Sequence, residues 1–231
     1  MRKGLTILGL FCIILSVSSV WLAPWLATST LRTRLVQKLA TEDVQVQLAA
    51  SPGLVLALGQ ADSLQAVAHA GKVGVVPFRE LTLTGERLKI DVPALLAHDG
   101  LQVTRAERLE LRGIIDADGL RSVLTQHIDK LENVQVDIQQ ESILVTAQTK
   151  LLGRTADVEL EGVVRGDSAG LYFDMTRLNI RNARVGTAQL GEMFGNITLA
   201  KTDKMPLGLR IQDVEQSEGT IIITAVRPPE D

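Results

Sequence analysis

An alternation of apolar and polar side chains with a period of two runs through most of the chain after residue 43. Val44, Val46 and Leu48 alternate with glutamines, as a strand with one buried face requires. Turn residues such as Gln139–Ser142 and Arg165–Ser168 separate similar segments. The same period returns in residues 79–92, 101–115, 134–153, 155–164, 171–180, 206–214 and 219–226. The pattern predicts about ten strands, mostly antiparallel.

The strand signal in the segment RELTLTGERLKIDV changes its parity part of the way along. Leu81 and Leu83 share one face, whereas Leu88 and Ile90 take the opposite parity after Gly85. One extra residue at a β-bulge returns the apolar side chains to the core. We therefore predict a long, bent strand with a bulge at Gly85.

A different signal occurs where the turn residues Ser51, Pro52 and Gly53 precede a run with no polar side chain. We interpret Leu54–Leu58 as a strand that is apolar on both faces. One of its faces would touch the interior of the domain, and the other would touch a covering element or a lipid.

Helical periodicity interrupts the strands in a few places. Residues 30–40 predict a short amphipathic helix, and residues 186–194 predict a second short one. The clearest helix covers residues 116–131, where Asp116 or Asp118 can cap the first turn. Its apolar stripe consists of Leu120, Val123, Leu124, Ile128 and Leu131.

No low-complexity linker divides residues 30–231, so we expect them to form a single domain. A sheet with this many strands must curl, and an amphipathic helix laid on its concave face covers what the curl exposes. The predicted fold class is α+β, with a long curved antiparallel β-sheet or elongated barrel wrapped about an amphipathic helix.

The N-terminal segment, residues 1–29, has its own character. After Arg2 and Lys3 no charge occurs until Arg32, and the run 4–27 is long enough to cross a hydrocarbon core of about 30 Å. A short basic stretch before an apolar run also describes a signal peptide. We favour a retained transmembrane anchor because two tryptophans near its end suit a membrane interface. The anchor residues are Leu8, Leu10, Ile13, Ile14, Leu15, Val20, Trp21, Leu22 and Trp25.

An apolar segment at the start of a chain acts as an export signal in either interpretation. We therefore expect the protein at the cell membrane, with residues 30–231 on the extracytoplasmic side. Cys12 lies in the apolar run and is the only cysteine, so that domain has no disulfide.

Composition and motifs narrow the function. Aromatic residues are only 3% of the chain and the net charge is -3, which argues against a nucleic-acid partner. His69, His98 and His127 lack metal-ligand spacing, and no motif for a nucleophile, a phosphate loop or a dinucleotide is present. We expect a non-catalytic protein without a metal or a cofactor, although the acidic residues leave an envelope hydrolase open.

Three segments carry a resemblance to a known family: SPGLVLALGQADSLQAVAHAG, VPFRELTLTGERLKIDVPALL and KMPLGLRIQDVEQSEGTIIITA. In their order and spacing they resemble the LmeA-like phospholipid-binding family of bacterial envelope proteins, over roughly residues 30–226. The resemblance implies an elongated β-structure about a helix, with an apolar channel that holds the acyl chains of phospholipid. It implies no catalytic residues.

An acyl chain gains about 0.8 kcal/mol for each buried methylene, so such a channel needs a continuous aliphatic lining. The same positions would equally fill a dry core. A structural or scaffolding envelope protein, which recruits an unknown envelope partner, is therefore the alternative function. Our lining candidates are Leu81, Leu83, Leu88, Ile90, Leu109, Leu111, Val145, Leu171 and Phe173.

Overall fold

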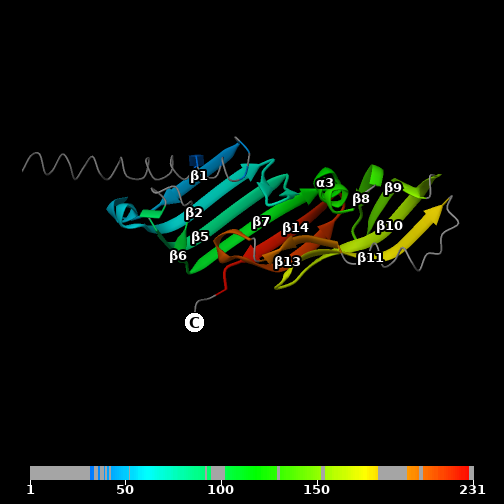
Figure 1. Ribbon diagram of the computed structural model, residues 1–231. Helices are drawn as coiled ribbons and strands as arrows, with labels where there is room; N and C mark the ends of the chain where they lie inside the picture. Colours follow the sequence, from blue (N-terminus) through cyan, green and yellow to red (C-terminus); the bar gives the residue numbers. More distant parts are fainter. Residues whose placement is uncertain are drawn as a thin grey trace, which may run out of the picture.

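A computed structural model gives the fold of most of the chain (Figure 1). It describes residues 32, 33, 36, 39, 41, 43–51, 53–91, 93–94, 102–128, 131–151, 154–181, 197–202 and 205–228. The expected anchor or signal segment, 1–29, and the helix expected at 186–194 lie outside the described residues. Residues 32, 33, 36 and 39 are helical, in agreement with the helix predicted for 30–40. None of the described helices is long and apolar enough to cross a membrane.

Antiparallel strands form two main sheets, and the first of them is the large sheet. Its strand order is β1-β2-β5-β7-β14-β13, with β6 paired to β5. The C-terminal hairpin thus returns to pair with β7 and completes this sheet. The strands are β1 (Val44–Ala49), β2 (Gln60–His69), β5 (Glu80–Ile90), β6 (Val103–Arg105), β7 (Arg108–Asp116), β13 (Arg210–Ser217) and β14 (Thr220–Val226).

The second sheet is a meander, as the sequence predicts, because its strand order β12-β11-β10-β9-β8 follows the chain. A separate small hairpin joins β3 (Lys72–Val73) to β4 (Val76–Pro77). The strands of the second sheet are β8 (Leu131–Ile138), β9 (Ile143–Leu151), β10 (Arg154–Gly166), β11 (Gly170–Arg181) and β12 (Ile197–Lys201).

The helix α3 (Ala117–His127) lies where the two sheets meet (Figure 1). Asp116 caps it, since the Gly119 N–H donates to Asp116 Oδ1 at 2.9 Å. Leu120, Val123 and Leu124 are buried, as the predicted stripe requires, but the helix ends at His127 and Leu131 begins β8. One of the two predicted capping residues is therefore confirmed, and the helix is shorter than expected.

The two sheets contact each other through the C-terminal hairpin. The Gly219 N–H donates to the Ile138 carbonyl at 2.8 Å, and Gln216 Nε2 donates to the Gln139 carbonyl at 2.7 Å. The prediction of a mostly β fold with curved antiparallel sheets is confirmed. The strands nevertheless divide into two sheets, and the wrapping of one sheet about a helix stays a prediction.

The run interpreted as the strand Leu54–Leu58 is instead a 3₁₀-helix, η1 (Gly53–Leu58). A short apolar run shows no period that separates a strand from a helical turn, so the sequence did not distinguish them. Gly59, with φ of 77°, ends η1 and lets β2 begin. Leu56 is buried, whereas 70% of Leu58 is exposed.

The predicted bulge at Gly85 is also wrong, although the strand does change its parity nearby. Gly85 stays on the buried face, where an added Cβ would lie 2.9 Å from Leu88 Cδ1. The parity changes at Arg87, whose φ is 46°, and the neighbouring strand has two consecutive exposed residues, Asp62 and Ser63. The register between β2 and β5 is the same before and after Arg87. Both strands change their parity together, and no residue is inserted in only one of them.

Candidate lipid-binding surface

One face of the large sheet is apolar from β1 to β14, because the alternating positions of each strand point to the same side. Its residues fall into two clusters of buried side chains. The junction cluster lies beside α3 and the second sheet and includes Val44, Ala68, Leu81, Ile115 and Ile221. The distal cluster lies farther along the large sheet and comprises Leu56, Ala61, Leu64, Ala66, Leu83, Leu88, Ile90, Val103, Leu109, Leu209 and Ala225.

The junction cluster contains buried side chains from the large sheet, from α3 and from the second sheet. The side chains of Val145 and Phe173 on the second sheet are fully buried, and so is Leu124 on α3. Phe173 further packs over Gly162, where an added Cβ would lie 2.6 Å from Phe173 Cζ. This region has the dense packing of a protein core.

The described cover of the distal cluster comes from two short segments. Among the described residues, η1 supplies Leu56 and the turn before β13 supplies Leu207 and Leu209. η1 is held at its end by the Ile90 N–H, which donates to the Gly59 carbonyl at 2.6 Å. A 3₁₀-helix of two turns has few internal hydrogen bonds and opens more readily than a strand in a sheet.

The predicted lining residues therefore do not share one space. Leu83, Leu88, Ile90 and Leu109 belong to the distal cluster, and half-buried Leu111 packs against both clusters. Leu81, Val145, Leu171 and Phe173 belong to the junction cluster. Whether any of them touches lipid stays a prediction.

Seven residues of the distal cluster were absent from the predicted lining, and Leu64, Ala66 and Leu56 are three of them. Leu64 and Ala66 follow the alternation of β2, so the period of two was a sufficient signal for them. Leu56 lies in the run whose structure was predicted wrongly, and no sequence signal placed it over the sheet.

The opposite faces of both sheets are polar and form open grooves. A groove of about 610 Å³ on the large sheet is lined by outward side chains that include Gln47, Gln65, Glu86 and Arg108. Neither carboxylate nor guanidinium side chains suit an acyl chain there. This groove lies on the far side of the sheet from the distal cluster.

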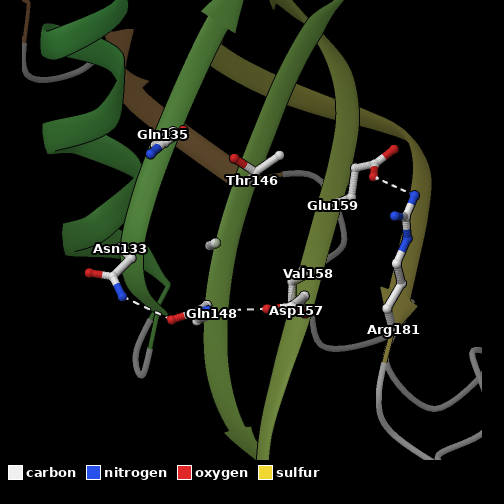
Figure 2. Close-up of a pocket in the computed structure, with 9 residues that line it drawn as sticks. Asn133, Gln135, Thr146, Gln148, Asp157, Val158, Glu159 and Arg181 are labelled. Carbon is white, nitrogen blue, oxygen red and sulfur yellow. Dashed lines mark hydrogen bonds and ion pairs between the residues drawn. The ribbon is translucent and has the colours of Figure 1, made fainter.

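A second groove, of about 380 Å³, lies on the outer face of the second sheet (Figure 2). Its side chains bond to one another: Asn133 Nδ2 donates to Gln148 Oε1 at 2.9 Å, and Gln148 Nε2 donates to Asp157 Oδ1 at 3.2 Å. Arg181 pairs with Glu159 at 3.3 Å. The row of polar groups gives this sheet a solvated face.

His69 is the described histidine that lies beside two carboxylates. Its Nδ1 is 3.1 Å from Asp43 Oδ2, and its Nε2 is 3.8 Å from Glu80 Oε2. These groups tie the ends of β2 and β5 to the residue before β1. Neither groove nor the distal cluster includes them. Within the described part of the chain, no group of three or more His, Cys, Asp or Glu side chains could hold a metal ion.

Comparison with known proteins gives the family. The model of the LmeA-like phospholipid-binding family matches residues 20–226, nearly the whole chain. The chain therefore belongs to the LmeA-like phospholipid-binding family, as its sequence resemblance indicated. Neither the curated proteins nor the solved structures gave a match.

Proposed function

We propose that this protein holds the acyl chains of a phospholipid against the distal cluster of the large sheet. Membership of a phospholipid-binding family supports a phospholipid as the partner. The choice of site rests on one observation: among the described residues, η1 and the turn Leu207–Leu209 are the two short segments that cover the distal cluster. Acyl chains would replace Leu56 of η1 above the sheet.

The chemistry of this face suits a hydrocarbon chain. The buried members of the distal cluster are all Leu, Ile, Val or Ala, so no buried polar side chain among them would lose a hydrogen bond to the lipid. Each methylene that leaves water contributes about 0.8 kcal/mol. The lipid is held and carried without a chemical step, and no cofactor takes part.

Two alanines on β2 provide a matched test. Ala66 belongs to the distal cluster and pairs with Val46 and Leu83, whereas Ala68 belongs to the junction cluster, two residues away on the same face. If the distal cluster opens to acyl chains, Ala66→Leu fills lipid space and lowers lipid retention about tenfold, with less than about 1 kcal/mol of lost stability. Ala68→Leu overpacks a closed core and costs about 1–3 kcal/mol, while the folded protein retains lipid.

The measurement is native mass spectrometry of the full chain after exposure to phosphatidylglycerol or phosphatidylethanolamine vesicles. Urea unfolding of the same variants gives their stabilities. Co-purified phospholipid that Ala66→Leu removes supports the proposal. A wild-type chain that takes up no lipid from either kind of vesicle contradicts it.

A dry scaffold is the second candidate, and the burial of the predicted lining residues favours it. All of them except Leu111 are less than about a tenth exposed, as a packed core requires. On this alternative, Ala66→Leu and Ala68→Leu destabilise the protein by similar amounts and neither changes lipid content.

We further propose that the domain lies outside the cytoplasm of a bacterial cell, at the membrane, and that residues 4–27 anchor it there. The apolar, uncharged character of that run supports this location. Alkaline phosphatase fused after Asp231 is active only outside the cytoplasm, so an inactive fusion contradicts export. The intact mass of the mature chain tells a retained anchor from a cleaved signal peptide.

A further inference from the structure

We propose that the outer edge of β1 pairs with β1 of a second copy of this chain and joins two large sheets into one. β1 is the first strand in the order of the large sheet and lies along one edge of it (Figure 1). The inference goes beyond the proposed function, because this pairing needs no lipid.

The backbone of β1 presents hydrogen-bonding groups at this edge. In an antiparallel pair, residues that bond to the partner strand alternate with residues whose N–H and C=O groups point away from it. The His69 N–H donates to the Asp43 carbonyl at 3.0 Å, so Asp43 and every second residue after it bond to β2 in the observed register. The backbone groups of Val44, Val46 and Leu48 therefore point to the outer edge.

A side chain from outside the strand agrees with this direction. Arg32 Nε donates to the Val44 carbonyl at 2.9 Å, so the carbonyl at the start of the edge has a partner. Within the part of the chain that the structure describes, no protein group bonds to the backbone of Val46 or Leu48 at this edge. Such a row of unpaired groups is a template for a strand from another chain.

The other edge strands of the two described main sheets carry features that oppose such pairing, and β1 does not. β13 exposes Asp213 and Glu215, and β8 exposes Glu132 and Asp137. The pairing of each of these strands with its neighbour also contains a register shift. β12 has five residues and ends in the exposed Lys201. The sequence of β1, VQVQLA, has no charge and no proline, and its register with β2 is regular.

A second β1 fits this edge because the strand is complementary to itself. Antiparallel pairing about a two-fold axis at Gln47 places Val46 of each copy opposite Leu48 of the other. Both residues direct their backbone groups outward, so each such pair exchanges both of its backbone hydrogen bonds. The carbonyl of Val44 keeps its bond to Arg32 in this register. The same surface is used on both copies, as in the commonest kind of homodimer.

The side chains favour the same register. Val46 and Leu48 are half-buried and pack against the distal cluster, whereas Gln47 is exposed on the opposite, polar face. Residues of equal parity face each other in this register, so the apolar faces of both copies lie on one side. The two distal clusters then continue into each other through Val46 and Leu48. The facing pair on the axis, Gln47 with Gln47, brings no like charges together.

Disulfide cross-linking tests this on the full chain. Because Cys12 is the only cysteine, a Cys12→Ala background makes Gln47→Cys the only thiol. The two α-carbons at position 47 should lie about 4.5 Å apart across the axis, within the range of a disulfide. Gln45→Cys is the matched control, since its counterpart in the other copy should lie about 13 Å away along the strand. In phosphatidylcholine vesicles under mild oxidation, we expect a covalent dimer from position 47 and none from position 45.

Charge substitutions give a second readout that needs no cysteine. Gln47→Glu and Gln47→Lys each place like charges on the axis and should weaken the dimer at least about tenfold, measured by sedimentation in detergent. An equal mixture of the two variants should restore it, because opposite charges then meet. Gln45→Glu should change the dimer little, since position 45 faces Ala49 of the other copy. Both glutamines are exposed, so the urea midpoints of these variants should match that of the wild type.

The possible outcomes decide the inference separately from the proposed function. Equal cross-linking at positions 45 and 47 indicates random encounters and overturns it, and so does a wild-type chain that stays monomeric. A mixture of Gln47→Glu and Gln47→Lys that does not dimerise shows that position 47 does not lie on the axis, which also overturns it. A dimer that takes up no phospholipid supports the β1 pairing and contradicts the lipid site.

Discussion

The effect of Gly113→Ala on the stability of the protein should change its sign when the ring of Phe78 is removed. Gly113 lies in β7 on the buried face, and an added Cβ would lie 2.5 Å from Phe78 Cε1 and 2.7 Å from Cδ1. The ring is buried, and its backbone cannot shift easily because it is hydrogen-bonded at two neighbouring positions. The Phe78 N–H donates to the Gly71 carbonyl at 2.7 Å, and the Arg79 N–H donates to the Ile114 carbonyl at 2.8 Å.

The magnitude follows from these distances. Carbon atoms in contact prefer about 3.5–4.0 Å, so Gly113→Ala must displace the Phe78 ring by about 1 Å. Overpacking of this kind costs about 1–3 kcal/mol of unfolding free energy. Without the ring, a glycine in a strand is about 0.5–1 kcal/mol worse than alanine, and Gly113→Ala should then stabilise the protein.

A double-mutant cycle measures this change of sign. Wild type, Gly113→Ala, Phe78→Ala and the double variant are unfolded in urea, followed by circular dichroism, and the slope m is checked for a common unfolded state. Phe78→Leu replaces Phe78→Ala if the alanine variant does not fold. The reasoning is refuted if Gly113→Ala stabilises the wild-type chain, or if its effect is the same with and without the ring.

Two smaller predictions concern the helix cap and the strained strand. Asp116→Ala should lower the unfolding free energy by about 1 kcal/mol because Gly119 loses its acceptor, while Asp116→Asn should keep most of it. The control is Asp118→Ala, which removes an exposed pair and should cost less than about 1 kcal/mol; equal losses in a urea titration would contradict the cap. Arg87→Gly should be neutral or stabilising by about 1 kcal/mol, since glycine adopts a φ of 46° without strain. Arg87→Ala loses the same pair with Glu107 without this relief, so equal melting temperatures for the two variants would count against strain at this position.

The sequence predicted the strands well wherever one face of each strand is exposed to solvent. In the second sheet, Ala147 is buried and its polar neighbours Thr146 and Gln148 are less so, and this alternation is visible in the residues themselves. The apolar run of η1 carried no such contrast, so its helical form was not predictable. The site of the parity change was missed for another reason. Gly85 is a glycine because Leu88 and Leu109 pack against its α-carbon, whereas the turn in the backbone falls on Arg87.

For the candidate site too, the sequence predicted some features and missed others. Alternation identified Leu83 and Leu109 as core residues, and both are buried. It contained no information on which strands become neighbours, so it did not separate the distal cluster from the junction cluster. That separation depends on the pairing of β7 with β14, in which Asp116 is the direct partner of Thr220 although the whole second sheet lies between them in the sequence.

The late arrival of β14 has a consequence for the life of the chain before it is folded. Until β14 leaves the ribosome, β7 has an edge of unpaired N–H and C=O groups, and Ile115 has no Ile221 beside it. Contacts so distant in the sequence form slowly. We therefore expect a polypeptide that stays open until β14 is made, which would suit the export that we propose, and a product truncated before residue 210 that proteases clear.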